Sequence, residues 1–233
     1  MMPANQFEKR MTTKQFTAIV PVRAGSRRLP NKNISDFGGT NLLNWKLQQL
    51  KKVPEITKIV VSSDSDIMLE IAKNAGVETH KRAIEYCDEQ TKSFGEVVQH
   101  IAESVDGEHI VWATCTAPLV EPVDYSNAIK YYLDGLQSGH DSLMSIEPFK
   151  RYLWNENGPI NYKLGKEHVP SQQLEELYFV TDGILIAPRL DMIKWSYFHG
   201  TNPVKFKLDK VKCVDIDDKL DLLVAKAWLT ELK

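Results

Sequence analysis

The chain has 233 residues, with 29 Lys and Arg against 31 Asp and Glu, and therefore a formal net charge of −2. This balance supplies no general attraction to nucleic acids or anionic membranes, so a local basic patch needs a specific explanation. No apolar run approaches the roughly 20 residues of a membrane helix, and the N-terminus lacks the apolar core of a signal peptide. We therefore expect a cytoplasmic protein that binds neither nucleic acid nor membrane.

Three cysteines without a CxxC pair favour neither a disulfide framework nor a structural zinc site. Residues 1–15 are polar and show no periodicity, which predicts a flexible leader. The remaining residues, 16–233, suffice for a single large α/β domain and are too few for two full ones.

Short apolar, β-branched runs alternate with segments of helical spacing along most of the chain. Strands are predicted at 17–22, 58–62, 77–80, 109–113, 141–146, 178–188 and 203–208, and helices at 41–52, 65–75, 93–104, 123–136 and 219–232. Ser63 and Asp64 are expected to cap the second of these helices. Such alternation with short connections is typical of right-handed βαβ units, so we predict an α/β fold with a mostly parallel central sheet flanked by helices.

The alternation stops between about residues 147 and 177. This segment contains several aromatic residues, turn signals at Asn157-Gly158-Pro159 and at Gly165, and no helical period until its end. A structureless loop of about thirty residues would be unusual in a compact domain, so we predict an inserted excursion that carries a hairpin. Its apolar residues indicate a dimer interface.

Four cations follow the first predicted strand directly: Arg23, Arg27, Arg28 and Lys32. Loops at the carboxyl ends of strands bind ligands in open α/β folds, and Arg and Lys side chains with free backbone N–H groups suit a polyphosphate. We interpret residues 23–33, the basic loop, as a triphosphate-binding loop; a solvated basic loop is the alternative. The Walker A pattern GxxxxGK[ST] is absent, which disfavours an ATPase of that type.

A pair of carboxylates, Asp215 and Asp217, precedes the last predicted helix. Alternate side chains of an extended segment share one face, so both can hold one Mg²⁺ ion, which typically takes one or two protein carboxylates with phosphate oxygens and water. Asp218 would face away and cap the helix. Asp221, one helical turn beyond, is either a surface residue or a partner that supports the two carboxylates, and we favour the surface. Acidic residues before a helix are often only caps, but together with the basic loop the pair supplies both parts of a nucleotidyl-transfer site.

The pattern Arg23-x-Gly25-Ser26-Arg27-x-Leu29-x-x-Lys32-Asn33 resembles the signature loop of the CMP-sugar-acid synthetases, the acylneuraminate cytidylyltransferase family. Two further segments, from Arg82 to Ser93 and from Asp215 to Asp217, resemble the cytosine-binding and closing motifs of that family. The resemblance implies a Rossmann-like nucleotide-diphospho-sugar transferase fold with a small inserted dimerisation element. It also implies a homodimer that transfers CMP from CTP to a 2-keto-3-deoxy sugar acid with Mg²⁺ and releases pyrophosphate.

Carried over residue by residue, the resemblance implies that Arg23 and Lys32 are catalytic cations and that Asp215 and Asp217 bind Mg²⁺. The nucleotide-binding residues would be Ala24, Gly25, Ser26, Arg27, Asn33, Arg82 and Ser93, and the sugar-binding residues Thr114, Lys150, Gln172, Gln173 and Asp182. Arg82 would donate to a carbonyl of the base and Ser93 would contact ring atoms, which favours a pyrimidine. Without the resemblance, Arg82 would be interpreted as a surface ion-pair residue.

Three departures from the sialate enzymes fall on the sugar side. Thr114 stands where those enzymes carry a glutamine, Ser171 where they carry an arginine, and Asp182 where they carry an asparagine. A carboxylate at 182 would repel the carboxylate of an acceptor but could accept from hydroxyl or amino groups. The resemblance implies an acceptor that is N-acetylneuraminate or a relative such as legionaminate or pseudaminate, and the departures leave open a sugar acid other than N-acetylneuraminate. Two alternatives stay open: a 3-deoxy-octulosonate acceptor, and a non-catalytic nucleotide-binding module.

Overall fold

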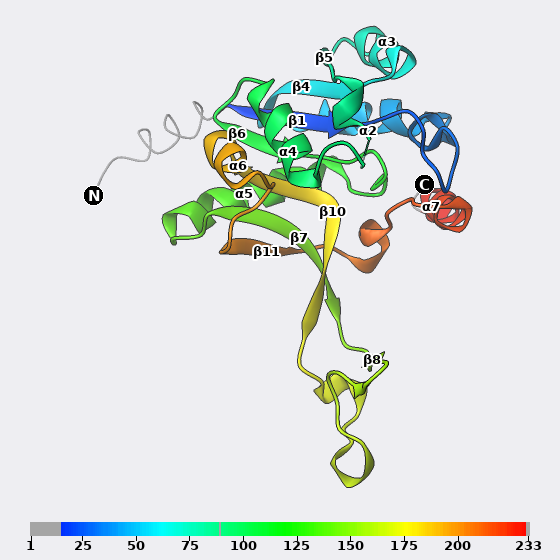
Figure 1. Ribbon diagram of the computed structural model, residues 1–233, viewed down its shortest axis with the longest axis vertical. Coiled ribbons are helices and arrows are strands. Elements are labelled where there is room, and N and C mark those ends of the chain that lie inside the picture. Colours follow the sequence, from blue (N-terminus) through cyan, green and yellow to red (C-terminus); the bar gives the residue numbers. More distant parts are fainter. Residues whose placement is uncertain (1–14, 89, 232–233) are drawn as a thin grey trace.

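The computed structural model describes residues 15–88 and 90–231, and a seven-stranded sheet forms its centre (Figure 1). The strand order is β11-β7-β10-β6-β1-β4-β5. Neighbouring strands are parallel except that β10 runs antiparallel to both β6 and β7. The predicted α/β fold with a mostly parallel sheet flanked by helices is thereby confirmed. The predicted leader, apart from Gln15, lies outside the described residues.

The strands of this sheet fall close to the predicted segments. Their bounds are β1 Phe16–Pro21, β4 Ile56–Ser63, β5 Glu78–Lys81, β6 His109–Trp112, β7 Ser142–Phe149, β10 Leu177–Pro188 and β11 Pro203–Lys207. Two further pairs of short strands lie outside it: β2 Asp36–Phe37 with β3 Thr40–Asn41, and β8 Trp154–Asn155 with β9 Gly158–Pro159.

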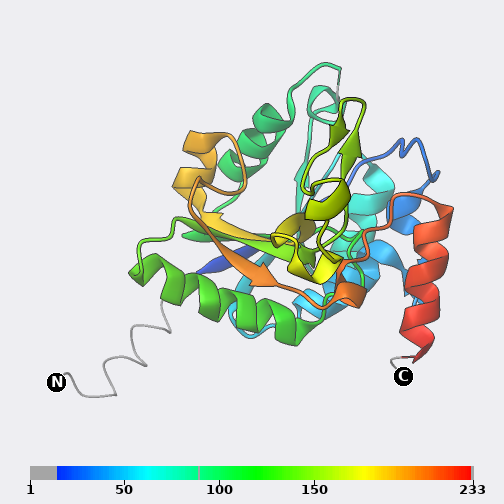
Figure 2. The same ribbon diagram turned by 90° about the horizontal axis from the view of Figure 1, so that it is seen from below.

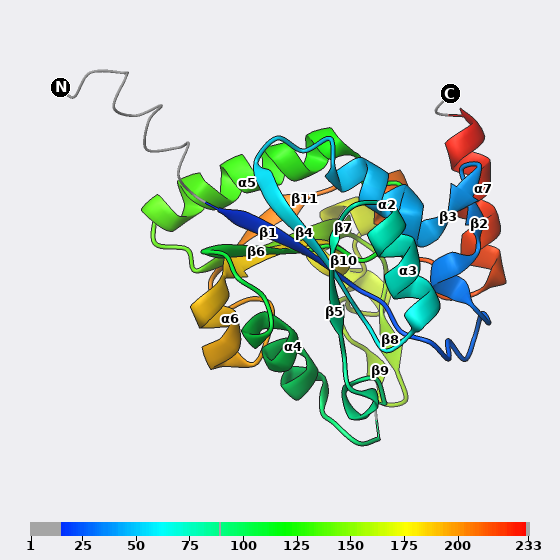
Figure 3. The same ribbon diagram turned by 90° about the horizontal axis from the view of Figure 1, so that it is seen from above.

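Helices cover both faces of the sheet (Figure 3). Their bounds are α2 Leu42–Leu50, α3 Asp66–Asn74, α4 Phe94–Glu103, α5 Pro122–Gln137, α6 Arg189–Trp195 and α7 Lys219–Glu231. Ala18 and Val20 of β1 pack in the core shared with α2, α3 and α5, whereas Ile19 packs in the core shared with α4 and α6. Because successive side chains of β1 are buried on opposite faces, its sequence is apolar apart from Thr17. Of the described helices, none combines the length and apolar character needed to cross a membrane.

Two helix starts show how local sequence sets the element ends. Asn41 caps α2 by accepting from the N–H of Asn44, and Ser65 caps α3 by accepting from the N–H of Met68. The prediction that Ser63 and Asp64 cap α3 is therefore wrong. The capping residue is Ser65, one residue beyond Asp64, because β4 continues through Ser63. The helix α6 was not predicted from the sequence at all.

Residues 147–180, called the arm below, project away from the sheet as a long extension of β7 and β10 (Figure 1), and Figure 2 looks along it. At its base Phe149 pairs with Leu177 and Glu147 with Phe179, and a register shift follows Val180. Several apolar side chains of the arm are exposed: Tyr152, Trp154, Ile160, Leu164, Phe179 and Val180. Dimerisation through this surface stays a prediction.

The last helix, α7, packs on the edge of the molecule beside β2 and β3 (Figure 3). Its Ala225 belongs to a small cluster of buried residues with Phe37, Leu42 and Leu119. Ile216, which precedes the helix, is fully buried in the same cluster. This packing brings the segment that carries Asp215 and Asp217 to the basic loop, which lies near the start of the chain.

Candidate active site

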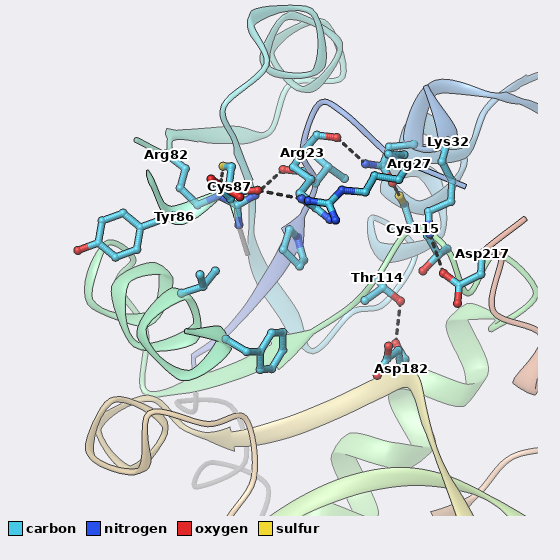
Figure 4. A pocket seen from close by; sticks show the side chains of 18 of the residues that line it. Arg23, Arg27, Lys32, Arg82, Tyr86, Cys87, Thr114, Cys115, Asp182 and Asp217 are labelled. Carbon is cyan, nitrogen blue, oxygen red and sulfur yellow. Dashed lines mark hydrogen bonds and ion pairs between the residues drawn. The ribbon is translucent and has the colours of Figure 1, made fainter. Parts of the chain in front are cut away.

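A cavity of about 590 Å³ opens at the carboxyl ends of β1, β5 and β6 (Figure 4). Its walls come from the basic loop, from residues 82–97 at the end of β5 and the start of α4, from the loop after β6, from Asp182 and from Asp217. Parallel strands collect their carboxyl ends at one edge of a sheet, so loops far apart in sequence meet there.

The basic loop keeps its shape through contacts of its own backbone. Asn33 donates from Nδ2 to the carbonyl of Arg23 at 3.1 Å, and the Ala24 N–H donates to Asp64 Oδ1 at 2.9 Å. Gly25 has φ +76, a left-handed conformation that glycine adopts without strain. Ser26 and Arg27 line the cavity, whereas Ala24 and Gly25 do not.

Arg23 and Lys32, the predicted catalytic cations, both line the cavity and both have partners (Figure 4). Arg23 donates from Nη1 to the carbonyl of Cys87 at 2.9 Å. Lys32 donates from Nζ to Asp217 Oδ1 at 3.1 Å, and Arg28 Nη2 lies 2.7 Å from the same oxygen. Burial alone would raise the pKa of Asp217, but the hydrogen bond and charge of Lys32 and the charge of Arg28 outweigh burial and lower that pKa.

Asp215 and Asp217 lie in an extended segment, and no strand forms there. Because Ile216 between them is fully buried, the two carboxylates point to the other side, as the alternation predicted. Burial raises the pKa of Asp215 above its ordinary value, while a hydrogen bond from Thr116 opposes this rise. Asp215 Oδ1 is buried and has no hydrogen-bond partner in the described part of the chain.

The segment is held in place by the first turn of α7. Asp218 Oδ1 accepts from the N–H groups of Leu220 and Asp221, as a capping residue does. Asp221 accepts with Oδ2 from the N–H groups of Asp217 and Asp218 at 3.0 Å each. It thus supports the carboxylate segment, which was the less favoured of its two predicted roles.

The donor set suits one hard divalent cation. A buried carboxylate oxygen without a partner, on Asp215, stands beside a second carboxylate, and oxygen ligands are what Mg²⁺ prefers. No group of three or more His, Cys, Asp and Glu side chains that could hold a metal ion occurs among the described residues. Phosphate oxygens and water would therefore have to complete the coordination, as is usual for Mg²⁺.

Asn33, predicted to contact the nucleotide, lies buried between two loops. Its Oδ1 accepts from Cys115 Sγ at 3.3 Å while its Nδ2 holds the carbonyl of Arg23. Burial raises the pKa of the Cys115 thiol to about 12, so this thiol stays protonated and can donate. Asn33 therefore joins the basic loop to the loop after β6.

Of the two predicted base-binding residues, Arg82 and Ser93, only Arg82 lines the cavity. Arg82 lines the cavity, but it is buried and donates from Nη2 to the carbonyl of Val22 at 2.7 Å and from Nε to Cys87 Sγ at 2.9 Å. It is therefore not a surface ion-pair residue. Ser93 caps α4 in a capping box with Glu96 and is not among the cavity-lining residues.

The predicted sugar-binding residues separate into two groups. Thr114 and Asp182 line the cavity, and Thr114 Oγ1 donates to the carbonyl of Asp182 at 2.8 Å (Figure 4). Lys150, Gln172 and Gln173 lie on the arm, where Lys150 Nζ donates to the carbonyl of Gln172 at 3.2 Å. The structure does not bring these three to the cavity of their own chain.

An aromatic wall of the cavity was not predicted. Phe94, Trp112 and Phe198 line it, and the ring of Phe198 lies 5.3 Å from that of Phe94 and 5.8 Å from that of Trp112. Tyr86 lines the same end and stacks on His100 with ring centroids 3.8 Å apart. Trp112 is also buried in the core shared with α4 and α6, and no spacing in the sequence connects it to residues of α4 or of the segment after α6.

A comparison with known protein families finds a match within the first two thirds of the chain. The model of the family described as "Cytidylyltransferase" matches residues 17–157, a range that holds the basic loop, Arg82 and the loop after β6.

Curated relatives are similar over most of the chain. N-acylneuraminate cytidylyltransferase A of Danio rerio is 22% identical over 226 residues, which are 94% of this chain and 51% of that protein. Pseudaminic acid cytidylyltransferase of Campylobacter jejuni is 24% identical over 217 residues, which are 89% of this chain and 93% of that protein. The chain thus spans about half the length of the N-acylneuraminate relatives that it matches.

Solved structures share the fold. A CMP:2-keto-3-deoxy-manno-octonic acid synthetase complexed with CTP aligns with a TM-score of 0.70 at 14% identity, covering 95% of this chain and 100% of the other. A 4-diphosphocytidyl-2C-methyl-D-erythritol synthase of Anaerococcus prevotii aligns with a TM-score of 0.68 at 13% identity, covering 95% and 99%. With more than half of its length matched by the family model, and with the Rossmann-like fold of these nucleotidyltransferases, the chain belongs to the cytidylyltransferase family.

Proposed function

We propose that this chain transfers CMP from CTP to a 2-keto-3-deoxy sugar acid and releases pyrophosphate. One observation carries the proposal: in a member of the cytidylyltransferase family, the cations of the basic loop meet Asp217 in one cavity, beside a buried carboxylate with an unpaired oxygen. Polyphosphate and metal are the two groups that such a site would hold together. Because CTP is a cytoplasmic metabolite, we place the reaction in the cytoplasm.

In this reaction the anomeric hydroxyl of the acceptor attacks the α-phosphorus of CTP, and the bond to the leaving pyrophosphate breaks. Arg23 and Lys32 would stabilise the negative charge that grows on the leaving group. Lys32 and Arg28 are engaged by Asp217 in the free protein. Binding of CTP would therefore exchange one anionic partner for another, so the cations are already oriented before the nucleotide arrives.

We assign Mg²⁺ to Asp215 and Asp217. The cation would neutralise negative charge on the phosphate oxygens of CTP. Thr116, which donates to Asp215, and Asp221, which holds the backbone of Asp217, would keep the two carboxylates in place.

The acceptor would face Thr114 and Asp182. Burial, followed by the charges of Asp215 and Asp217, raises the pKa of Asp182 above its ordinary value. A carboxyl group in this position suits a hydroxyl or amino donor on the acceptor better than the acceptor's own carboxylate. We therefore favour a nonulosonate other than N-acetylneuraminate, such as legionaminate or pseudaminate, with N-acetylneuraminate and 3-deoxy-octulosonate as the competitors.

The test is pyrophosphate release with CTP and Mg²⁺ against these four acids, with GTP and UTP as nucleotide controls. Release with one acid and with CTP over the other nucleotides is the expected result. If 3-deoxy-octulosonate were the best acceptor, the nonulosonate assignment would be wrong. Tight CTP binding without release from any acid would instead favour a non-catalytic nucleotide-binding module.

We further propose a homodimer in which the arm of one copy reaches the cavity of the other. Support comes from two features of the arm: it carries exposed apolar side chains, among them Trp154 and Leu164, and it carries Lys150, Gln172 and Gln173 away from the cavity of its own chain. A second copy would cover the apolar surface and would bring these polar residues to an acceptor.

A further inference from the structure

Lys46 is a buried cation that the proposed reaction does not use. Its side chain, on α2, is fully buried, and none of the ion pairs in the described part of the chain includes it. Asp124, whose charge acts on Lys46 from a greater distance, is paired with Lys212 at 2.8 Å. An ammonium without a carboxylate partner is costly to bury, so the contacts that it makes call for an explanation.

These contacts tie together two segments that carry walls of the cavity. Lys46 Nζ donates to the carbonyl of Ala117 at 2.8 Å and to Tyr125 Oη at 2.9 Å. Tyr125 Oη in turn donates to the carbonyl of Gly183 at 3.3 Å. Ala117 belongs to the loop after β6, and Gly183 directly follows Asp182 in β10. The Lys46 amine therefore anchors the loop to α2 directly and anchors β10 at Asp182 through Tyr125.

Two neighbours of Lys46 fasten the same loop. Trp45 Nε1 and Gln49 Nε2 each donate to the carbonyl of Pro118 at 2.9 Å. Two consecutive carbonyls of the loop, those of Ala117 and Pro118, therefore receive three donors from about one turn of α2. The loop cannot shift against the helix without losing several of these bonds.

The anchored loop contacts three parts of the site through consecutive residues (Figure 4). Thr114 donates to the carbonyl of Asp182, and Cys115 donates to Asn33 of the basic loop. The carbonyl of Thr116 accepts from the N–H of Ile216 at 2.8 Å, between the two proposed Mg²⁺ ligands. The position of the loop 114–118 thus sets the spacing between Asp182, the basic loop and the segment that carries Asp215 and Asp217.

We propose that Lys46 is a positioning residue that holds the loop 114–118 and the strand at Asp182 in the arrangement that the acceptor requires. This inference rests on the proposed transfer reaction. Thr114 of this loop bonds directly to the carbonyl of Asp182, whereas the link from the loop to Arg23 runs indirectly, through Cys115 and Asn33. Loss of Lys46 therefore affects the acceptor more than CTP.

The central variant is Lys46→Met, which keeps the length of the side chain and removes its donors. The matched control is Lys52→Met, which changes an exposed lysine just beyond the end of α2. For Lys46→Met we expect kcat/KM for the acceptor to fall about tenfold or more, while the Kd for CTP changes by less than about threefold. The denaturant midpoint at pH 7 should change little, because removal of an unpaired buried charge offsets the loss of the donor to Ala117 and Tyr125.

This combination separates positioning from simple structural support. A lower denaturant midpoint that accounts for the lost activity, an equal loss of CTP affinity, or unchanged acceptor kinetics would each overturn the inference. A second variant, Tyr125→Phe, removes the hydroxyl that links Lys46 to Gly183 and keeps the bond from Lys46 to Ala117. It should lower acceptor kcat/KM in the same direction without weakening CTP binding.

A readout without turnover uses the thiol of Cys115, which is buried in the anchored loop. We expect iodoacetamide, with the labelled site identified by peptide mass mapping, to modify Cys115 faster in Lys46→Met than in the wild type or in Lys52→Met. Loss of the nearby positive charge would by itself make the thiol less reactive, so a faster reaction reports loop displacement. If no acceptor reacts with the wild type, the proposed function fails, and this labelling still decides the role of Lys46: an unchanged rate overturns it.

Discussion

At the scale of single residues, the cations assigned to catalysis are held before any ligand binds. Arg23 donates to the carbonyl of Cys87, and Lys32 shares Asp217 with Arg28. Such bonds fix the direction of long, flexible side chains, and the ordering entropy is thus largely lost on folding instead of during the reaction. On the proposed function, a polyphosphate would therefore bind with little further ordering of these side chains.

Replacement of Arg23 with Ala should lower kcat by about 100-fold or more if its guanidinium acts mainly on the leaving pyrophosphate. KM for CTP should rise much less, because Arg27, Arg28 and Lys32 remain. Steady-state kinetics of pyrophosphate release would measure both constants. Lys130→Ala, which changes an exposed cation on α5, serves as the control, and near-normal turnover in Arg23→Ala would refute the assigned role.

Lys46 makes stability depend on pH in a defined direction. Burial lowers the pKa of Lys46 from 10.5 to about 7, so between these values the unfolded chain binds more protons than the folded chain. The free energy of unfolding contributed by this group therefore rises with pH, by about 2 kcal/mol between pH 7 and pH 9. Urea unfolding of the wild type and of Lys46→Met at both pH values measures this difference.

The comparison with Lys46→Met is needed because other groups titrate nearby. The pKa of Cys115 is raised by burial, and this opposes the trend from about pH 8 upward, where the unfolded thiol begins to ionise. The wild type should gain stability relative to the variant as pH rises from 7 to 9. Parallel curves for the two proteins would mean that Lys46 keeps its ordinary pKa in the fold.

At the scale of elements, close packing rather than helix propensity decides some positions. Gly135 of α5 is such a site, since a Cβ placed there would collide with the side chain of Val204 on β11. Alanine is the better helix former by about 1 kcal/mol, so propensity alone predicts that Gly135→Ala stabilises the protein. Overpacking against β11 predicts the opposite.

We expect Gly135→Ala to lower the free energy of unfolding by about 1–3 kcal/mol, because the backbone of α5 must shift away from β11. Equilibrium urea denaturation is the measurement. Asp134→Ala, one residue earlier and exposed, is the control and should change stability by less than about 0.5 kcal/mol. A stabilised Gly135→Ala variant would show that β11 yields easily.

The carboxylate segment before α7 allows a test of Mg²⁺ binding that needs no turnover. Asp217→Asn should weaken binding of Mg²⁺ to the protein–CTP complex by about tenfold or more, as measured by calorimetry. The same change frees Lys32 and Arg28 from their carboxylate partner, so CTP without Mg²⁺ should bind as well as before or better.

Asp218→Asn is the matched control for this change. Asp218 caps α7 and has no assigned metal role, and asparagine is an equally good capping residue. Its Mg²⁺ affinity should remain that of the wild type. Equal losses in both variants would contradict the assignment of the metal to Asp217.

At the scale of the whole molecule, the arm extends from the domain and leaves several of its apolar side chains exposed in a single chain. It carries exposed apolar side chains and the predicted acceptor residue Lys150 away from the cavity. We expect a homodimer by light scattering after size exclusion. Trp154→Glu should shift it toward the monomer, whereas Val123→Glu, at a similarly exposed apolar position of α5, should not.

Complementation tests whether the arm serves the cavity of the other copy. Arg23→Ala damages a cavity and Lys150→Ala damages an arm, so each homodimer should be inactive. In a mixed dimer, one site has both defects and the other has neither. An equal mixture after subunit exchange should recover about a quarter of wild-type activity, since half of the dimers are mixed. No recovery in proven mixed dimers would mean that Lys150 does not act across the dimer.

Sequence by itself determined the order and type of most elements. The apolar periods of β1, α2 and β4 are local properties, and so are the glycine and capping signals that end helices. Local sequence also indicated the basic loop, because four cations directly follow a buried strand, and the pair Asp215 and Asp217 gained meaning only in combination with that loop. Their meeting at one edge follows from the parallel order of the strands.

Only the tertiary structure decided which of these residues share a cavity. The pair of Lys46 and Ala117, 71 residues apart, and the contact of Lys32 with Asp217, 185 residues apart, depend on chain packing that no local pattern encodes. For the same reason the aromatic wall was missed, Ser93 proved to be a helix cap, and Asp221 proved to support the carboxylates. Periodicity reports how a segment is buried, whereas a site depends on which distant segments are buried together.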